Sequence, residues 1–186
     1  MTNNIIKMET IDSIYFYSEF ELFGAFSNFS TAYFTDKDGL RYNCSEQYLM
    51  LQKCLLFDQN NTELLRKITN SKSPAAIKLY GRQVKNFDEN IWSQHKYKIM
   101  LQGLRYKFNQ NPISEEMLLY TGNKIIYEAS KRDAIWGIGY NIYEALRTNK
   151  ENYGKNLLGK ALMELRDEIK MQKDVSEIRL SDSDFE

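Results

Sequence analysis

Cysteine, histidine and proline are scarce in this sequence, whose 186 residues include two cysteines, one histidine and two prolines. One histidine and two separated cysteines do not make a metal-binding cluster, and we expect neither a metal nor another cofactor. Cys44 and Cys54 lie ten residues apart around one predicted helix, which makes a disulfide between them geometrically unfavourable. Free thiols are typical of a reducing compartment, so we expect a cytoplasmic protein.

Long hydrophobic runs and an excess of charge of one sign are also missing. No stretch approaches the ~20 apolar residues of a membrane-spanning helix. Residues 1–10 carry Lys7 and Glu9 and lack the apolar core of a signal peptide, so we expect no membrane partner. The 25 basic residues balance 25 acidic residues. This balance argues against a broad electrostatic grip on duplex nucleic acid, but not against recognition of a single nucleotide.

Apolar spacing and capping residues predict a mostly helical protein. The sequence predicts helices over residues 45–57, 62–68, 74–81, 90–109, 114–122 and 156–171. Short β-rich runs at 14–17 and 125–127, and a hairpin over 32–42 that turns at Asp38–Gly39, predict strands. The expected fold class is therefore α+β: one compact, predominantly helical domain with a small antiparallel sheet.

The expected domain spans residues 13–172, because no linker or internal repeat interrupts them. Residues 1–12 are polar, which predicts a flexible N-terminus. From Lys173 onward acidic residues dominate, so residues 173–186 are expected to form an acidic, disordered C-terminal tail.

Ionisable and aromatic residues concentrate in two segments, the first of which is Ser45–Tyr48 with Lys53. Glu46 follows a predicted helix cap, and Lys53 lies seven residues later, on the same face and about 10 Å along the axis. An acid and an amine on one face can support proton transfer to a small ligand. The spacing alone fits a solvated surface pair equally well, and a carboxylate in a first helical turn also complements the helix dipole.

The second segment is Asp133–Gly139, which contains Trp136 and a Gly-x-Gly at Gly137 and Gly139. The glycines would allow the backbone to approach a ligand closely and to offer amides to a phosphate. Trp136 would stack on a base or a ribose. The alternative is a core tryptophan beside an ordinary turn, and it is at least as well supported by this pattern.

Three further positions are candidates for phosphate contacts. Arg82 follows the end of a predicted helix and can bind a phosphate in bidentate fashion, although arginines there also satisfy helix carbonyls. Lys107 belongs to a basic cluster late in the longest predicted core helix, where it also suits the negative helix end. Asn156 opens the last predicted helix, where free amides favour anions, or it is simply a cap.

Taken in order, these segments resemble the YbiA-like family, also called NADAR. The resemblance covers roughly residues 14–170, and no single motif carries it. It depends on an ordered set at compatible spacing: Phe26–Phe29, Ser45–Tyr48, Gln52–Lys53, Gly81–Arg82, Trp92, Lys107–Phe108, Thr121–Gly122, Glu128–Ser130, Asp133–Gly139, Gly154–Gly159 and Leu162–Met163.

The resemblance implies an N-glycosidase of ribosides, with a compact, mostly helical α+β fold. Some members are expected to cleave riboflavin-pathway intermediates and others to remove ADP-ribose from guanine, in nucleic acid or a nucleotide. Tyr153 stands where many members have tryptophan. The segment Ile138–Tyr140 departs from the glycine-rich form of the riboflavin-type members, which favours the ADP-ribose branch.

We therefore expect hydrolysis of a ribose C1–N bond, most simply from an ADP-ribosylated guanine nucleotide or nucleic acid, or else from a phosphorylated riboside. Functional pairing with an ADP-ribosyltransferase is implied. The expected catalytic residues are Glu46, Lys53 and Asp133. The expected substrate contacts are Asn28, Phe29, Arg82, Lys107, Glu128, Trp136, Gly137, Gly139 and Asn156.

Two readings from other classes remain open. A non-catalytic module that binds ADP-ribose or a nucleotide would need the same pocket without the chemistry. A nucleic-acid binder that uses the long basic helix would show steep salt dependence, which the neutral charge makes a poor fit.

Overall fold

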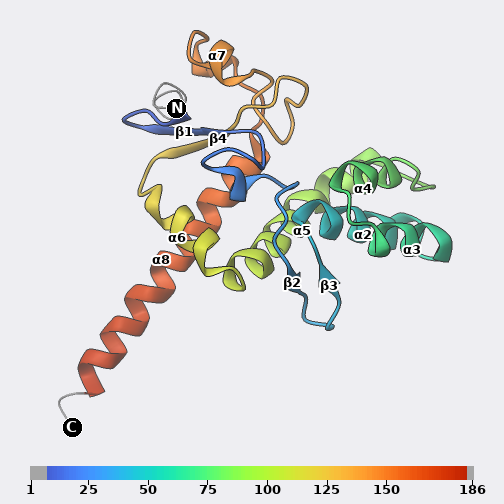
Figure 1. Ribbon diagram of the computed structural model, residues 1–186, viewed down its shortest axis with the longest axis horizontal. Helices are drawn as coiled ribbons and strands as arrows, with labels where there is room; N and C mark the ends of the chain where they lie inside the picture. Colours follow the sequence, from blue (N-terminus) through green and yellow to red (C-terminus); the bar gives the residue numbers. More distant parts are fainter. Residues whose placement is uncertain (1–7, 184–186) are drawn as a thin grey trace.

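The long helix α5 (Glu89–Asn109) lies in the middle of the molecule and packs against helices on both sides. The computed structural model describes residues 8–183, with side chains to residue 176. On one side of α5 lie α2 (Ser45–Phe57), α3 (Thr62–Asn70) and α4 (Pro74–Gly81), as Figure 1 shows. On the other side lie α6 (Pro112–Tyr120) and α8 (Leu157–Ser183). The chain is one compact α+β domain dominated by helices, as expected.

The helix starts follow local capping signals. Ser73 caps α4, with Pro74 in the first turn, so this helix begins where the sequence predicts it. Elsewhere a neighbouring residue is the cap: Asn61 accepts the amide of Leu64 at α3, and Asp88 accepts two amides at α5. These shifts of one or two residues leave each helix in its expected place.

The strands form two separate pairs. β2 (Phe34–Thr35) and β3 (Arg41–Tyr42) make the expected antiparallel hairpin, with Gly39 in the turn at a φ of +84°. β1 (Ser13–Phe16) pairs with β4 (Ile125–Glu128), and this pair is parallel, so the antiparallel expectation is wrong for it. Most of the helices lie between β1 and β4 in the chain, and such a long connection permits a parallel return.

The core joins the parallel strand pair to the helices. Phe16, Phe26, Leu104, Phe108 and Leu162 are fully buried in one cluster contributed by β1, the loop after it, α5 and α8. A second cluster fills the space among the hairpin and α2, α3 and α4. Cys44 and Cys54 are both buried and free. The two clusters hold β4 and α2, which carry site residues, at fixed positions.

Both ends of the described chain are more ordered than the sequence predicts. Met8 is buried in the core and Glu9 forms an ion pair with Lys124, so residues 8–12 are not a loose segment. At the other end α8 runs on to Ser183, where a disordered tail was expected from residue 173. Lys173 pairs with Glu115 of α6 at 2.8 Å, which ties the start of this extension to the body. Residues 1–7 and 184–186 lie outside the described chain.

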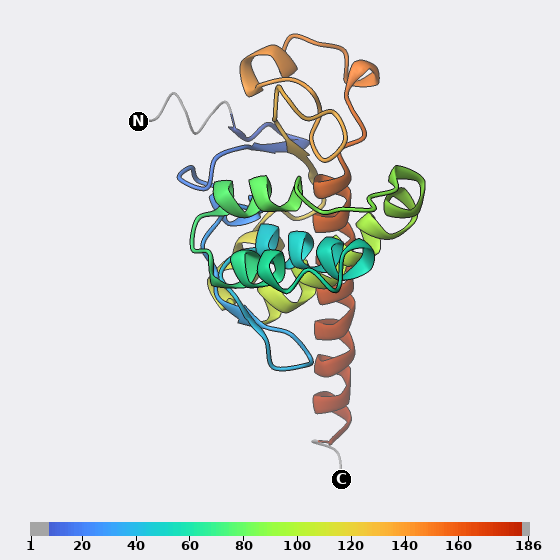
Figure 2. The ribbon, with the colours of Figure 1, turned by 90° about the vertical axis from the view of Figure 1, so that its right-hand side faces the viewer.

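Figures 1 and 2 show the C-terminal part of α8 projecting from the domain. Between residues 8 and 183, no helix combines the length and the apolarity that a bilayer crossing requires. Two short helices, η1 (Gly24–Phe26) and α7 (Ile142–Ala145), and the 3-10 turn η2 (Lys150–Asn152) complete the fold.

Candidate active site

A pocket of about 200 Å³, here called the inner pocket, lies where α2 begins and α4 ends. Its other walls are the loop at Ser27–Phe29 and the segment that follows β4. The three predicted catalytic residues line it: Glu46, Lys53 and Asp133. Five predicted substrate contacts also line it: Asn28, Phe29, Arg82, Glu128 and Trp136. The structure thus brings together residues that span a hundred positions of the sequence.

Glu46 lies in the first turn of α2 and is 5% exposed. Its backbone N–H donates to the carbonyl of Asn28 at 3.0 Å, which joins the helix start to the pocket loop. Burial raises the pKa of its carboxyl group to about 7, a net result in which the charge of Lys78 opposes the rise and that of Asp133 adds to it. A carboxyl group that titrates near neutral pH suits an acid/base role.

Ser45 was expected to cap this helix, but Cys44 occupies the cap position without a side-chain hydrogen bond. The Ser45 hydroxyl is buried and has no hydrogen-bond partner among residues 8–183. The start of α2 is therefore held by its backbone bond to Asn28 and by burial, which are long-range contacts that a capping pattern cannot reveal.

Glu128 ends β4 and lines the same pocket. Its Oε2 is buried without a hydrogen-bond partner in the described chain. Burial, together with the charges of Asp133 and Glu46 and against that of Lys78, raises its pKa to about 8. The amide oxygen of Asn28, also buried and unpartnered there, faces the pocket as well. Such buried, unpaired polar groups are costly in a folded protein, and a bound ligand would satisfy them.

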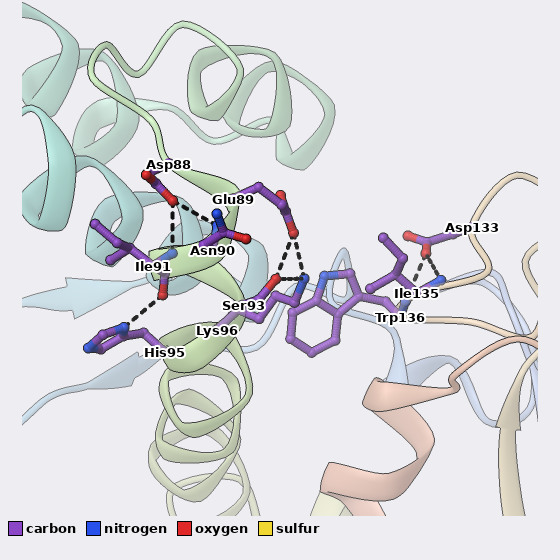
Figure 3. Close-up of polar contacts among 10 residues, drawn as sticks. All are labelled: Asp88, Glu89, Asn90, Ile91, Ser93, His95, Lys96, Asp133, Ile135 and Trp136. Atoms are coloured by element: carbon purple, nitrogen blue, oxygen red, sulfur yellow. Dashed lines mark hydrogen bonds and ion pairs between the residues drawn. The ribbon is translucent and has the colours of Figure 1, made fainter.

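Asp133 shapes the loop that carries Trp136. Its Oδ1 accepts the backbone amides of Ile135 at 2.9 Å and of Trp136 at 2.8 Å, as Figure 3 shows. This local turn lets both Asp133 and Trp136 line the inner pocket. The indole forms one wall and Phe29 another, so a flat group would meet an aromatic surface on entry.

Lys53 lies two turns after Glu46 in α2 and also lines the pocket. Its amine donates to the carbonyl of Gly81 at 3.0 Å and lies 4.1 Å from the ring centre of Phe87. Burial lowers the pKa of this amine, while the charges of Glu89 and Glu46 oppose that change. The expected convergence of an acid and an amine on one small volume is therefore present.

Lys78 is a pocket residue that the sequence reading missed. It lies in α4, and its amine is 5.6 Å from the ring centre of Phe29. Among the nearby charges, Lys78 is the one that most favours the ionised form of Glu46. Lys78 lies four residues before Arg82, and residues at this spacing share one face of a helix, so the sequence could have indicated that both face the same site.

Two predicted contacts are corrected by burial. Lys107 is fully buried behind the pocket, where its amine donates to the carbonyls of Ala25 at 2.7 Å and Ser27 at 3.1 Å. Burial lowers the pKa of Lys107 to about 8. Asn156 is 5% exposed, and its amide group accepts the backbone N–H of Glu128 and donates to the carbonyl of Ile126. Both side chains support pocket elements and neither lines the pocket.

The two loop glycines also stand outside the pocket lining. A side chain at Gly137 would lie 2.8 Å from the carbonyl oxygen of Glu128, and Gly139 has a φ of +77°. The glycines are needed because the loop passes close to β4 and turns sharply. The structure gives both glycines a role in loop shape, and their contact with a phosphate stays a prediction.

Two further hollows adjoin the inner pocket. The side hollow, of about 190 Å³, includes Ser18 and Glu19 in its lining. The outer hollow, of about 510 Å³, includes Tyr17 and Arg132. Phe29, Lys78 and Asp133 line all three spaces, so the spaces adjoin one another at these residues.

Comparison with known proteins assigns the family. A family model described as the NADAR domain matches residues 15–170. The chain belongs to the NADAR family. The match spans the expected domain almost completely and confirms the resemblance seen in the sequence.

This NADAR protein is 43% identical over 137 residues to an N-glycosidase of Acanthamoeba polyphaga mimivirus, covering 73% of this chain and 79% of the relative. It is 33% identical over 168 residues to the N-glycosidase YbiA of Escherichia coli (strain K12), covering 90% and 94%. These names place the chain in a family of hydrolases that act on N-glycosyl bonds. A solved NMR structure of the E. coli protein YbiA matches with a TM-score of 0.71 at 31% identity, over 90% of this chain and 91% of that one.

Proposed function

We propose that this chain hydrolyses the bond between C1 of a ribose and a guanine nitrogen, releasing ADP-ribose from ADP-ribosylated guanine in a nucleotide or in nucleic acid. The observation that carries the proposal is the inner pocket, where Glu46, Glu128 and Asp133 meet Lys53 and Lys78 beside an aromatic wall. The pocket collects the acid, the charge and the stacking surface that cleavage of a riboside requires.

Cleavage of a C1–N bond builds positive charge on the sugar, and a carboxylate close to C1 stabilises it. The bonding pair moves to the nitrogen, which takes a proton from Glu46. Water then adds to C1 and returns a proton to the carboxylate. Glu46 can exchange that proton at neutral pH because burial brings its pKa to about 7. Asp133 supplies the second carboxylate.

Lys53 has two possible roles in this mechanism. As a cation it would hold a hydroxyl or phosphate of the substrate. As a neutral amine it would attack C1 of the ring-opened ribose; the C1–N bond to guanine would then break, the guanine nitrogen leaving with a proton, and water would hydrolyse the resulting Schiff base to free the sugar and the lysine amine. The lowered pKa of Lys53 supports the second role. Borohydride added during turnover would trap a mass increase on Lys53 for the Schiff base and none for the cation.

The hollows beside the inner pocket leave room for a substrate larger than a simple riboside. The inner pocket, at about 200 Å³, is smaller than the ~300–1,000 Å³ typical of sites for drug-sized ligands. A ligand as long as ADP-ribose would have to continue into the adjoining hollows, and these are present.

A second candidate is cleavage of a phosphorylated ribosylamino-pyrimidine of riboflavin biosynthesis. It is favoured by a relative from Zea mays, a chloroplastic riboflavin biosynthesis protein that is 33% identical over 165 residues. The chain covers 84% of its own length there but a quarter of that relative, so the likeness concerns one part of a longer protein. An inner pocket that closes on a ribose and its base would serve this substrate too.

A product assay on both substrates tests the proposal. The purified protein is incubated with an oligonucleotide carrying ADP-ribosylated guanine and, separately, with the riboflavin-pathway riboside. We expect ADP-ribose to be released from the first. Release of ribose 5-phosphate from the second alone would replace the proposed substrate by the alternative. Tight binding without product from either would favour the non-catalytic module. Only the release of ADP-ribose from the guanine substrate would support functional pairing with an ADP-ribosyltransferase.

A further inference from the structure

We propose that Lys78 and Arg82 form an anion site for a diphosphate bridge, and that the outer hollow receives the nucleoside beyond it. This inference rests on the proposed function and specifies how its substrate is recognised. It predicts that the site prefers a pyrophosphate-linked group over a ribose that ends in one phosphate.

The position of Lys78 is the first argument. Lys78 lines the inner pocket, the side hollow and the outer hollow, so it lies where the three spaces adjoin. Arg82 lines the inner pocket and the outer hollow. A group that leaves the inner pocket toward the outer hollow has to pass both cations.

The second argument is that neither cation has an ion-pair partner within residues 8–183. Salt bridges elsewhere in the described chain engage lysines such as Lys67 and Lys150, whereas neither Lys78 nor Arg82 forms one within residues 8–183. Both lie near the C-terminal end of α4, where the helix dipole favours a cation. The dipole accounts for positive charge at this helix end, but not for two unpaired cations at the mouth of a cavity. An anion that bridges both side chains would supply the ion-pair partner that each of them lacks.

The third argument is what lies beyond the pair. The outer hollow adds Arg132, an exposed cation, and the side chains of Tyr17 and Leu79, which are each 55% exposed. A tyrosine ring beside a leucine offers a planar, apolar surface to a base, and the guanidinium can meet a second phosphate or a ribose. A terminal monophosphate would occupy Lys78 and leave this surface in water.

Binding measurements separate the two kinds of ligand. Calorimetry is performed with ADP-ribose and with ribose 5-phosphate on the wild-type protein and on three variants: Lys78→Met, Arg132→Gln and Lys72→Met. We expect ADP-ribose to bind on the order of tenfold more tightly than ribose 5-phosphate, the gain from one or two extra charged hydrogen bonds. Lys78→Met should weaken both ligands about tenfold. Arg132→Gln should weaken ADP-ribose alone.

Lys72→Met is the matched control, because Lys72 is an exposed lysine close in sequence that lines none of the three spaces. It should bind both ligands as the wild type does. Thermal melts of each variant check that loss of binding is not loss of folding. The inference is overturned if ribose 5-phosphate binds as tightly as ADP-ribose, or if Lys78→Met behaves like Lys72→Met.

Failure of this inference and failure of the proposed function give different results. If the protein releases ADP-ribose from guanine while ADP-ribose and ribose 5-phosphate bind equally, the proposed function is supported and the outer site is refuted. If ADP-ribose binds tightly through Lys78 and Arg132 while no guanine substrate is cleaved, the outer site stands and the proposed function falls.

Discussion

Carboxylates inside the pocket and carboxylates on the outer surface are held in opposite ways. On the surface, Glu168 accepts two hydrogen bonds from Arg105, at 2.6 and 2.8 Å, and these hold the pKa of its carboxyl group below the usual value. Glu63 is paired with Lys67 at 2.7 Å with the same effect on its pKa. In the pocket, burial raises the pKa of Glu46 to about 7 and of Glu128 to about 8.

The difference shows which charges serve the scaffold and which are kept for a reaction. Surface carboxylates are ionised and paired with cations, either on another helix or on the same helix. Within residues 8–183, the carboxyl groups of Glu46 and Glu128 form no salt bridge or side-chain hydrogen bond that would lock them in one protonation state. Strongly shifted carboxyl groups that share a cleft are typical of functional sites.

The largest expected effect is the loss of turnover when the pocket side of this comparison is changed. Glu46→Gln keeps the size of the side chain but cannot exchange a proton, so we expect the release of ADP-ribose to fall by about 10²-fold or more. Chromatography of released product under single-turnover conditions measures it. Glu63→Gln, the same change on the surface, should leave the rate unchanged. A Glu46→Gln variant as fast as the wild type would remove Glu46 from the mechanism.

The second prediction concerns stability against pH. Burial raises the pKa of Glu46 from 4.5 in the unfolded chain to about 7, so the folded state disfavours the charged form. The wild-type protein should therefore lose stability as pH rises from about 4.5 through 7, by up to about 3 kcal/mol from this group. Glu46→Gln carries no such penalty.

Urea unfolding of both proteins at pH 5 and pH 8.5 measures this difference. The free energy of unfolding of the variant, relative to that of the wild type, should be higher at pH 8.5 than at pH 5. An equal pH dependence in the two proteins would show that Glu46 is not buried as a neutral acid.

A smaller effect is expected from the support behind the pocket. Lys107→Met fits the space but removes the donor to the carbonyls of Ala25 and Ser27, so the loop that carries Asn28 and Phe29 should shift. Because small displacements of positioning residues slow reactions, we expect kcat/KM to fall on the order of tenfold. KM should carry much of the change, because the loop contacts the substrate.

Arg105→Met changes another cation of the same helix that lies outside the pocket lining. It should leave both kinetic constants unchanged. Identical kinetics for Lys107→Met and the wild type would mean that the loop holds its position without the buried amine.

The smallest effect belongs to the surface pair itself. Glu168→Gln breaks a hydrogen-bonded pair that is about one-third exposed, and such pairs contribute less than about 1 kcal/mol. We expect a small decrease in the free energy of unfolding, which added salt reduces, and no change in turnover. A loss of turnover here would mean that the two groups of carboxylates are coupled through α5 and α8.

Local patterns predicted local structure well. The Ser73–Pro74 start of α4 and the Asp38–Gly39 turn are each determined by neighbours in the chain, and both were read correctly. The parallel pairing of β1 and β4 was missed, because strands separated by more than a hundred residues leave no pairing signal in one sequence. The extension of α8 was missed because composition alone suggested a solvated tail.

The family resemblance predicted more of the site than the spacing and chemistry of the residues did. Glu46, Lys53 and Asp133 do share a pocket, but spacing alone left surface alternatives open for each. Lys107 was misplaced although it lies three residues after Leu104, on the apolar stripe of α5, which already indicated burial. Lys78 was overlooked because a lysine in an amphipathic helix is the ordinary case, and only the cavity distinguishes it.

Asn156 adds a side-chain link between β4 and the start of α8, which also pack together in the core. It adopts a left-handed backbone conformation with a φ of +51° just before α8 and grips β4 through both atoms of its amide group. The strand end that presents Glu128 is thus fastened to the root of the last helix. A shortened protein that ended before this helix would lose its grip on one of its two buried acids, even though every residue of the pocket would still be encoded.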